Sequence, residues 1–319
     1  MENKRKICFR TDASAEIGYG HFIRTLALAD MLKDDFECVF YTQSPTEYQR
    51  TEAEKVCKLV ALPADDSRFQ LFLDSLVGNE IVVLDNYFYT TDYQHAIREK
   101  GCKLVCIDDP HGIHYVCDVL ISHGFSKPTD FDAEPYTEIY TGIEWALLRS
   151  PFLRKIDFEQ KRNNSIVLNF GGADPFQVTE RVVGLLLKLN LSYQIKVILG
   201  DRVFLSEKNR SQVQTLHNLS AEQMAELFNN SALGIFTAST VCIEGLSRRL
   251  PLIVGYDVDN QERSYLRMRS EGLISPLGWL QDVTSESLLE AIKGVKDLKS
   301  INIHPEQIKE KYRTLFLKQ

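Results

Sequence analysis

A histidine follows a glycine-containing loop near the start of the chain, in a position from which it could act on a ligand. The largely apolar run Lys6–Arg10 precedes this loop, and Gly18 and Gly20 lie within it. His21 then begins a stretch with helical periodicity. Glycine lets the backbone turn sharply or approach a ligand, and the first N–H groups of a helix attract anions. The pattern makes His21 a candidate catalytic residue and Gly20 a candidate binding residue, although a histidine that only packs or caps the helix would give the same pattern.

Paired glycines follow a strand-like run in the second half of the chain. Gly171 and Gly172 come after Ile166–Phe170, where an α/β fold brings the backbone close to a ligand. Asp174 and Pro175 come next, and they suit the cap and first residue of a helix that needs no ligand. The two interpretations are compatible, so both glycines are candidates for nucleotide binding.

Two further helix starts in the second half carry polar residues. Ser239 and Thr240 open one helix, and Glu244 follows one turn later on the same face. Hydroxyls and helix N–H groups suit phosphate oxygens, while a carboxylate can accept both hydroxyls of a ribose. Asn260 and Gln261 open the other helix and offer amide groups to a sugar or phosphate. Ordinary helix caps with a surface glutamate would look similar.

Cofactor and metal patterns are absent from the sequence. A dinucleotide fingerprint needs a small residue where Arg24 stands and an acidic residue near the end of the next strand, which Val39–Thr42 does not offer. His111 and His114 lie on a loop rich in Asp, Pro and Gly, but their spacing matches no zinc motif. We therefore expect neither a nicotinamide or flavin cofactor nor a bound metal.

The composition is that of an ordinary globular protein. The chain has 319 residues, of which 44% are hydrophobic and 25% charged, and its formal net charge is −7. An acidic protein is a poor partner for nucleic acid or anionic membranes. Because the sequence contains no apolar run of membrane-spanning length and no signal-peptide pattern at its start, we expect a cytoplasmic protein. The seven cysteines are odd in number and lie mostly in apolar runs, which favours reduced, buried thiols.

Strand-like and helix-like segments alternate along the chain, which predicts an α/β fold with parallel sheets. The expected strands of the first half are Lys6–Arg10, Glu37–Tyr41, Lys58–Leu62, Ile81–Asp85, Lys103–Ile107 and Val119–Ser122, and its expected helices are His21–Leu32, Asp66–Val77 and Thr91–Lys100. Those of the second half are strands Ser165–Phe170, Gln194–Leu199, Val213–His217, Ala232–Phe236 and Leu252–Val254, with helices near Glu286–Val295 and Glu306–Phe316.

A polar run near the middle predicts a boundary between two domains. The alternating pattern breaks at Arg149–Pro151, and the polar run Asp157–Asn164 precedes a fresh strand. A chain of this length readily forms two domains. We expect Rossmann-like domains over residues 1–150 and 164–319, with a C-terminal helix that can pack back on the first domain.

Several of these segments, in their order along the chain, resemble the PseG family of UDP-2,4-diacetamido-2,4,6-trideoxy-β-L-altropyranose hydrolases, distant relatives of the MurG glycosyltransferases. The segment from Arg10 to Arg24 carries the most specific part of the resemblance. Further matches are Leu84–Tyr87, Asp108–Asp109, Gly142–Arg149, Gly171–Asp174, Ser239–Thr240 with Glu244, and Asn260–Gln261. Asn86 stands where some family members have a histidine.

The resemblance implies a GT-B fold, in which two Rossmann-like domains face an interdomain cleft. It implies hydrolysis of a UDP-linked 2,4-diacetamido-trideoxy sugar without a metal or cofactor, releasing UDP and a free sugar for pseudaminic (nonulosonic) acid biosynthesis. His21 would be the general base that activates water at the anomeric carbon. The implied substrate-binding residues are Gly20, Arg24, Tyr87, Asn260 and Gln261, and the implied UDP-binding residues are Gly171, Gly172, Ser239, Thr240 and Glu244.

Two other functions fit the same residues. A GT-B glycosyltransferase would pass the UDP-sugar to an acceptor hydroxyl, and MurG-like transferases usually dock on membranes. The nearest candidate for a docking patch, Phe69–Leu73, is more typical of a core-facing helix. A non-catalytic nucleotide-sugar binding protein would keep the Glu244 region and tolerate the loss of His21. The leaving group favours hydrolysis by one base, because UDP departs as a stabilised anion and needs no proton from a second acid.

Overall fold

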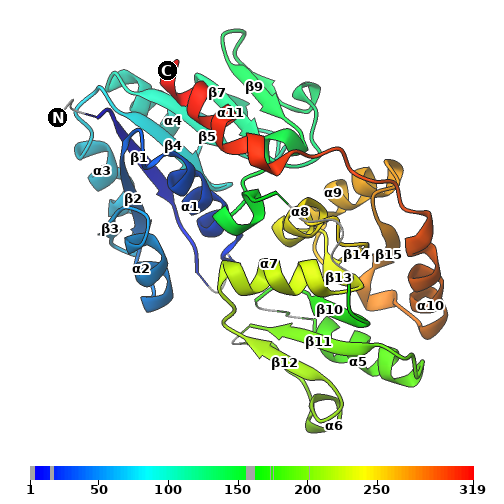
Figure 1. The fold of residues 1–319 in the computed structure, drawn as a ribbon. Helices are drawn as coiled ribbons and strands as arrows, with labels where there is room; N and C mark the ends of the chain where they lie inside the picture. Colours follow the sequence, from blue (N-terminus) through cyan, green and yellow to red (C-terminus); the bar gives the residue numbers. More distant parts are fainter. Residues whose placement is uncertain (1–3, 15–17, 156–161, 173, 175, 201) are drawn as a thin grey trace. The chain divides into compact units, whose positions relative to one another are not determined.

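The computed structural model describes residues 4–14, 18–155, 162–172, 174, 176–200 and 202–319 (Figure 1). Its described residues form two compact units, one of residues 1–153 together with 305–319 and the other of residues 154–304. Each unit is built on a parallel β-sheet. Among the described helices, none is both long and apolar enough to cross a membrane.

The first unit contains a seven-stranded sheet in the order β3-β2-β1-β4-β5-β7-β9. All six strand pairings are parallel. Its strands are β1 (Lys6–Thr11), β2 (Glu37–Gln43), β3 (Lys58–Leu62), β4 (Ile81–Asp85), β5 (Lys103–Ile107), β7 (Val119–Ser122) and β9 (Glu138–Thr141), and β6 (His114–Tyr115) pairs separately with β8 (Asp132–Ala133). Its helices are α1 (Gly20–Leu32), α2 (Glu47–Glu54), α3 (Ser67–Asp74), α4 (Thr91–Glu99) and α11 (Pro305–Leu317).

The second unit repeats this architecture with a six-stranded parallel sheet in the order β12-β11-β10-β13-β14-β15. Its strands are β10 (Ser165–Asn169), β11 (Gln194–Leu199), β12 (Gln214–His217), β13 (Leu233–Thr237), β14 (Leu252–Tyr256) and β15 (Ser275–Trp279). Its helices are α5 (Val178–Lys188), α6 (Glu207–Arg210), α7 (Ala221–Asn230), α8 (Thr240–Ser247), α9 (Asp259–Ser270) and α10 (Ser285–Gly294).

Burial explains why these segments form strands and helices. The central strands are largely apolar because a parallel sheet is covered on both faces, and all five residues of β4 are buried. On α1, the expected core face of Phe22, Leu26 and Ala29 is buried. The seven cysteines are free, and Cys57 is the one that is not fully buried.

The last helix belongs to the first unit, although the second expected domain ran from 164 to 319. Phe316 of α11 lies edge-on to Phe36, and the Tyr312 hydroxyl donates a hydrogen bond to the carbonyl oxygen of Trp145. Arg313 forms an ion pair with Asp35, with Nε 2.9 Å from Oδ1. The amphipathic C-terminal helix thus buries its apolar face against the first unit.

All eleven expected strands are confirmed, with ends that shift by up to two residues, and several elements were missed, among them α2, α6, α7, β6, β8, β9 and β15. The missed helices α2 and α7 begin with capping boxes, Thr46 with Gln49 and Ser220 with Gln223, so their start signals were present in the sequence. The missed strands β9 and β15 lie at sheet edges. β15 contains Pro276 and the positive-φ Gly278, two residues that argue against a strand in the sequence, although an edge strand tolerates both.

Candidate active site

The first candidate site lies at the switch point of the first unit's sheet, where the order of the strands along the chain reverses. The chain after β1 continues through α1 to β2 on one side, while β4 pairs with β1 on the other. Ligands of α/β proteins bind at the carboxyl ends of the strands beside such a switch point. His21 stands in the first turn of α1 after β1, and Asp85 is the last residue of β4. The fold therefore brings together two residues that are 64 positions apart in the chain.

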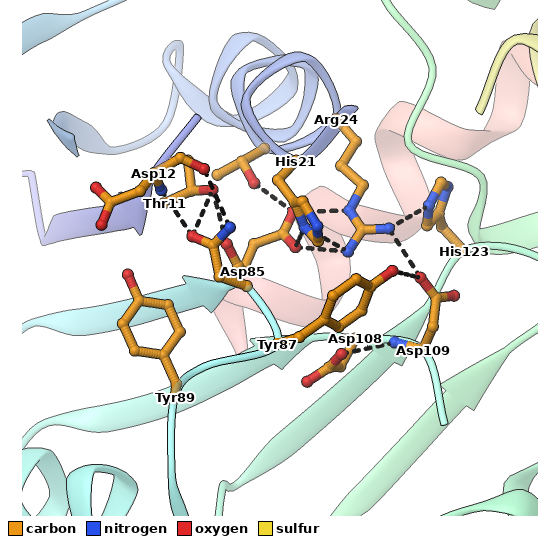
Figure 2. A network of polar contacts seen from close by, with 12 residues as sticks. Thr11, Asp12, His21, Arg24, Asp85, Tyr87, Tyr89, Asp108, Asp109 and His123 are labelled. Carbon is orange, nitrogen blue, oxygen red and sulfur yellow. Dashed lines mark hydrogen bonds and ion pairs between the residues drawn. The ribbon is translucent and has the colours of Figure 1, made fainter. Parts of the chain in front are cut away.

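His21 and Asp85 form a hydrogen-bonded pair in this position. Nδ1 of His21 lies 2.7 Å from Oδ1 of Asp85, and His21 is 8% exposed (Figure 2). Burial raises the pKa of Asp85, but the charge and hydrogen bonds of Arg24, together with His21, hold it well below its usual range. The carboxylate is therefore ionised and can only accept, so Nδ1 carries the hydrogen. Arg24 Nη2 also lies 3.1 Å from Nδ1, but the shorter contact with the carboxylate decides the tautomer.

This tautomer leaves the other ring nitrogen of His21 with a lone pair. In a neutral imidazole with Nδ1 protonated, Nε2 is the acceptor and can take a proton from water. Among the described residues, Tyr19, the N-cap of the helix that carries His21, makes no side-chain capping hydrogen bond, and the first turn of this helix holds no acidic residue. The first N–H groups of a helix attract an anion or a polarised ligand oxygen. The arrangement suits a general base beside a group that develops negative charge.

Arg24 is buried between two carboxylates. Figure 2 shows its guanidinium between Asp85 on one side and Asp109 and His123 on the other. Nε donates to Asp85 Oδ2 at 2.8 Å, and Nη2 donates to Asp85 Oδ1 at 2.5 Å. Nη1 donates to Asp109 Oδ2 and contacts His123 Nε2, each at 3.1 Å. Arg24 was expected to bind substrate, but it is 5% exposed and its nitrogens are engaged within the protein.

Tyr87 forms an exposed edge of the site. Its ring meets the His21 ring edge-on, with centroids 4.8 Å apart, and the centroid of the His111 ring lies 5.4 Å from that of Tyr87. Its hydroxyl donates to Asp109 Oδ2 at 3.1 Å. Tyr87 is 38% exposed, so it can contact a ligand that reaches His21.

His123 was missed by the sequence analysis. It directly follows β7, and its position at the carboxyl end of a parallel strand is the one signal that could have found it. Burial and the neighbouring Arg24 charge lower the pKa of His123 to about 4, so the ring is neutral near pH 7. Nε2 then accepts from Arg24, and Nδ1 carries a hydrogen that finds no partner among the described residues.

Asn86 ties the two strands of the switch point together. Its Oδ1 accepts from the backbone N–H of Asp12 at 2.6 Å, and its Nδ2 donates to the carbonyl oxygen of Asp12 at 3.0 Å. The Thr11 hydroxyl adds a bond to the backbone carbonyl of Asp85 at 2.7 Å. These bonds fix the end of β4, and with it Asp85, relative to the loop that leads to His21.

The second candidate site lies at the equivalent switch point of the second unit, between β10 and β13. Gly171 and Gly172 follow β10, and Ser239 and Thr240 follow β13. Ser239 is the N-cap residue of α8, yet it is exposed and its side chain makes no capping hydrogen bond. In the described part of the chain, the N-cap side chain therefore leaves the first N–H groups of α8 uncapped, which suits a phosphate site.

Asp174 occupies the start of the neighbouring helix α5. Its carboxylate accepts from the N–H of Val178 at 2.7 Å and from that of Thr179 at 2.9 Å, so it caps α5 from a position outside the helix. The expectation of a cap at Asp174 is confirmed for the side chain, but α5 begins only at Val178, and Pro175 lies outside the described residues. Because Asp174 neutralises α5, α8 is the better anion site of the two.

The paired glycines lie at a close approach of two loops. Gly171 has φ of +92°, a conformation that favours glycine, and a Cβ added there would meet open space. A Cβ added to Gly200, after β11, would lie 2.4 Å from the carbonyl oxygen of Gly172. Glycine at 200 therefore allows Gly172 to lie close to the end of β11, where a larger residue would clash.

Glu244, Asn260 and Gln261 are placed differently from one another. Glu244 lies one turn after Thr240 on α8, as expected, and is 4% exposed. Asn260 is exposed in the first turn of α9, whose N-cap is Val258, so the alternative that Asp259 or Asn260 caps this helix is wrong. Gln261 Oε1 accepts from the backbone N–H of Asp257 at 3.2 Å. Its amide NH₂ group remains a candidate donor to a ligand.

Within the part of the chain that the structure describes, no group of three or more His, Cys, Asp or Glu side chains is arranged to hold a metal ion. Nδ1 of His111 lies 2.9 Å from the backbone carbonyl oxygen of Asp109 and 3.2 Å from Asp108 Oδ1, so the loop that superficially resembled a metal motif is internally hydrogen-bonded.

Two parallel Rossmann-like sheets define an α/β protein of the GT-B class, and solved structures agree. No family model matches the chain. Over 99% of its length it is similar to MurG from Acinetobacter baumannii, with a TM-score of 0.64, 13% identity and 100% of that chain covered. The glycosyltransferase of kitacinnamycin is similar with a TM-score of 0.63, 12% identity and 99% of each chain covered. At such identities the likeness concerns the fold.

Two curated proteins are similar in sequence. The UDP-2,4-diacetamido-2,4,6-trideoxy-β-L-altropyranose hydrolase of Campylobacter jejuni is 25% identical over 84% of this chain and 97% of its own length. The uncharacterized protein MJ1062 of Methanocaldococcus jannaschii is 26% identical over 93% of this chain and 68% of its own length. The chain is thus a GT-B protein with moderately distant similarity to a UDP-sugar hydrolase.

Proposed function

We propose that the protein is an enzyme that hydrolyses a UDP-linked 2,4-diacetamido-trideoxy sugar without a metal. The observation that carries this proposal is the His21–Asp85 pair, which leaves Nε2 of His21 as an acceptor in the first turn of α1. Similarity to a protein named as such a hydrolase supports the substrate class. The free sugar released would be of the kind used for pseudaminic acid.

The proposed reaction balances with one base. A water oxygen attacks the anomeric carbon, the bond from that carbon to the UDP phosphate oxygen breaks, and UDP leaves with the electron pair. Nε2 of His21 takes a proton from the water and later returns it to solvent. UDP is a stable anion and needs no proton to leave, so the second carboxyl group of ordinary glycosidases is unnecessary. Ser239, Thr240, Glu244, Gly171 and Gly172 of the second unit are assigned to UDP, and Gly20, Tyr87, Asn260 and Gln261 to the sugar.

Release of UDP from a panel of UDP-sugars, with no acceptor added, tests this function. We expect turnover with a 2,4-diacetamido-trideoxy sugar and much slower turnover with UDP-glucose or UDP-N-acetylglucosamine. The solved neighbours are glycosyltransferases, so sugar transfer is the alternative. UDP release that begins only when an acceptor alcohol is added would favour it over hydrolysis, and UDP-sugar binding without any turnover would favour a binding protein.

Replacing Glu244 with alanine is expected to weaken UDP binding by about 10- to 100-fold, or ~1–3 kcal/mol, because charged hydrogen bonds to a ribose would be lost. Isothermal titration calorimetry with UDP measures the effect. Glu226→Ala is the matched control, since Glu226 is exposed on α7 of the same unit. A folded Glu244→Ala protein with unchanged UDP affinity would place the ribose elsewhere.

Hydrolysis is expected to continue at its full rate after treatment with EDTA. The proposed chemistry uses a histidine base and meets the charge of the diphosphate with the start of α8. Initial rates before and after chelation and dialysis provide the measurement. Activity that disappears with EDTA and returns with a divalent ion would contradict the metal-free mechanism.

A further inference from the structure

Arg24 has almost no hydrogen-bonding capacity left for a substrate. Its guanidinium has five N–H donors, of which two go to Asp85, one to Asp109 and one to His123. The remaining donor faces Nδ1 of His21, which already carries a hydrogen. A buried residue whose hydrogen-bond donors are all used within the protein can affect the reaction only through its neighbours.

The carboxylate of Asp85 likewise has all of its hydrogen-bonding capacity in use. Its Oδ1 accepts from His21 and Arg24, and its Oδ2 accepts from Arg24 and from the Thr25 hydroxyl at 2.6 Å. Asp85 is fully buried. A buried carboxylate with no cation beside it would stabilise a protonated imidazole, because an opposite charge within hydrogen-bond distance favours the charged form. A protonated His21 could not accept a proton from water.

We propose that Arg24 is a charge-compensating positioning residue, which offsets the charge of Asp85 so that Asp85 orients the His21 ring while favouring its protonated form less. This inference rests on the proposed function insofar as His21 is the base. It replaces the expectation that Arg24 contacts the substrate.

Asp109 and His123 hold the far side of the guanidinium in place. Burial raises the pKa of Asp109, but Arg24 and the other neighbours lower it below its usual range, so this carboxylate is ionised. With Asp85 it gives the cluster two negative charges against the one positive charge of Arg24, and His123 adds none. His123 can accept from Arg24 because it is neutral, and its burial keeps it so.

The other described groups around His21 are polar, but none carries a permanent positive charge. The ring of Tyr87 packs against His21, and burial raises the pKa of its hydroxyl well above the ordinary range. The ring of His111 lies 5.4 Å from that of Tyr87, and the pKa of His111 is raised chiefly by its hydrogen bond with Asp108. Burial in turn raises the pKa of Asp108. Arg24 is therefore the permanent positive charge of this cluster.

The test compares Arg24→Met, which removes the charge, with Arg24→Lys, which keeps it. The acid limb of the kcat/KM profile of Arg24→Met is expected to move to higher pH by about 1–3 units, as expected for an uncompensated neighbouring carboxylate. The Arg24→Lys limb should stay within about 0.5 unit of the wild type, with kcat lowered by lost geometry. NMR titration of the His21 ring in the substrate-free protein, assigned with His21→Asn, should show the same displacement.

The NMR titration separates this inference from the proposed function, because it needs no substrate and no turnover. If Arg24→Met does not fold, the double variant Arg24→Met/Asp85→Asn removes both charges, and its His21 ring should titrate near the wild-type pH. A displaced titration in the double variant would overturn the inference. An unmoved pH profile in folded Arg24→Met would overturn it too, and a raised KM with unchanged kcat would make Arg24 a substrate-binding residue instead.

Discussion

His21→Asn is expected to lower the rate of UDP release by at least about 100-fold while UDP affinity remains close to that of the wild type. The base acts on water at the anomeric carbon, and Asn offers no lone pair on nitrogen that could take the proton. The residues assigned to UDP lie in the second unit, so the substitution leaves them untouched. Single-turnover UDP release and calorimetry with UDP, on the same preparation, measure the two quantities.

The control for this variant is His95→Asn, because His95 is exposed on α4 of the same unit and takes no part in the cluster around Arg24. It should keep wild-type turnover. Near-wild-type turnover of His21→Asn would show that His21 is structural. A parallel loss of UDP affinity and turnover would show that it binds the nucleotide.

The strands could be predicted well because the buried strands of a parallel sheet appear in the sequence as continuous apolar runs. The same reasoning located the end of β1, after which the glycine-containing loop leads to His21, and the end of β4 at Asp85. What it could not give is their pairing. The contact between Nδ1 and the carboxylate joins a residue of α1 to the last residue of β4, and no local pattern specifies it.

A family motif does not specify what the side chain of Arg24 contacts. The resemblance implied that Arg24 binds the substrate, but the orientation of a long side chain depends on its tertiary partners. Two of these partners, Asp109 and His123, come from segments 85 and 99 residues away. His123 escaped notice altogether because one histidine after a short strand has no distinguishing spacing.

The predictions about helix caps differ from the structure for another reason. Asp174 was correctly identified as a cap, but the helix starts at Val178, since the carboxylate reaches the helix from an intervening turn in which Gln177 has φ of +54°. The unfilled cap at Ser239 is the opposite case. A serine there predicts a side-chain hydrogen bond to the helix, and the structure shows none. Such a departure from local preference is typical of a site that binds something else.

Asp85→Asn is expected to lower turnover by about 100-fold or more and to destabilise the first unit by about 3–5 kcal/mol. An amide has one accepting oxygen where the carboxylate has two. If the NH₂ group of the asparagine faces His21, it opposes an N–H donor of Arg24. Nδ1 of His21 must then accept a hydrogen bond from this NH₂ group, so the ring hydrogen moves to Nε2 and the base is lost. If the NH₂ faces the other way, it meets Nε–H of Arg24 instead.

Either orientation also leaves Arg24 without the carboxylate that takes two of its donors, which accounts for the loss of stability. Urea unfolding followed by circular dichroism measures that loss, and UDP release at a temperature where the variant is folded measures the catalytic effect. Asp118→Asn is the control, because Asp118 pairs with Lys103 and Arg98 in the same unit and is part-exposed. Breaking that pair should cost at most about 1 kcal/mol and leave turnover unchanged. Should folded Asp85→Asn retain wild-type turnover, the tautomer of His21 would have to be set by some group other than Asp85, and the charge compensation assigned to Arg24 would lose its purpose.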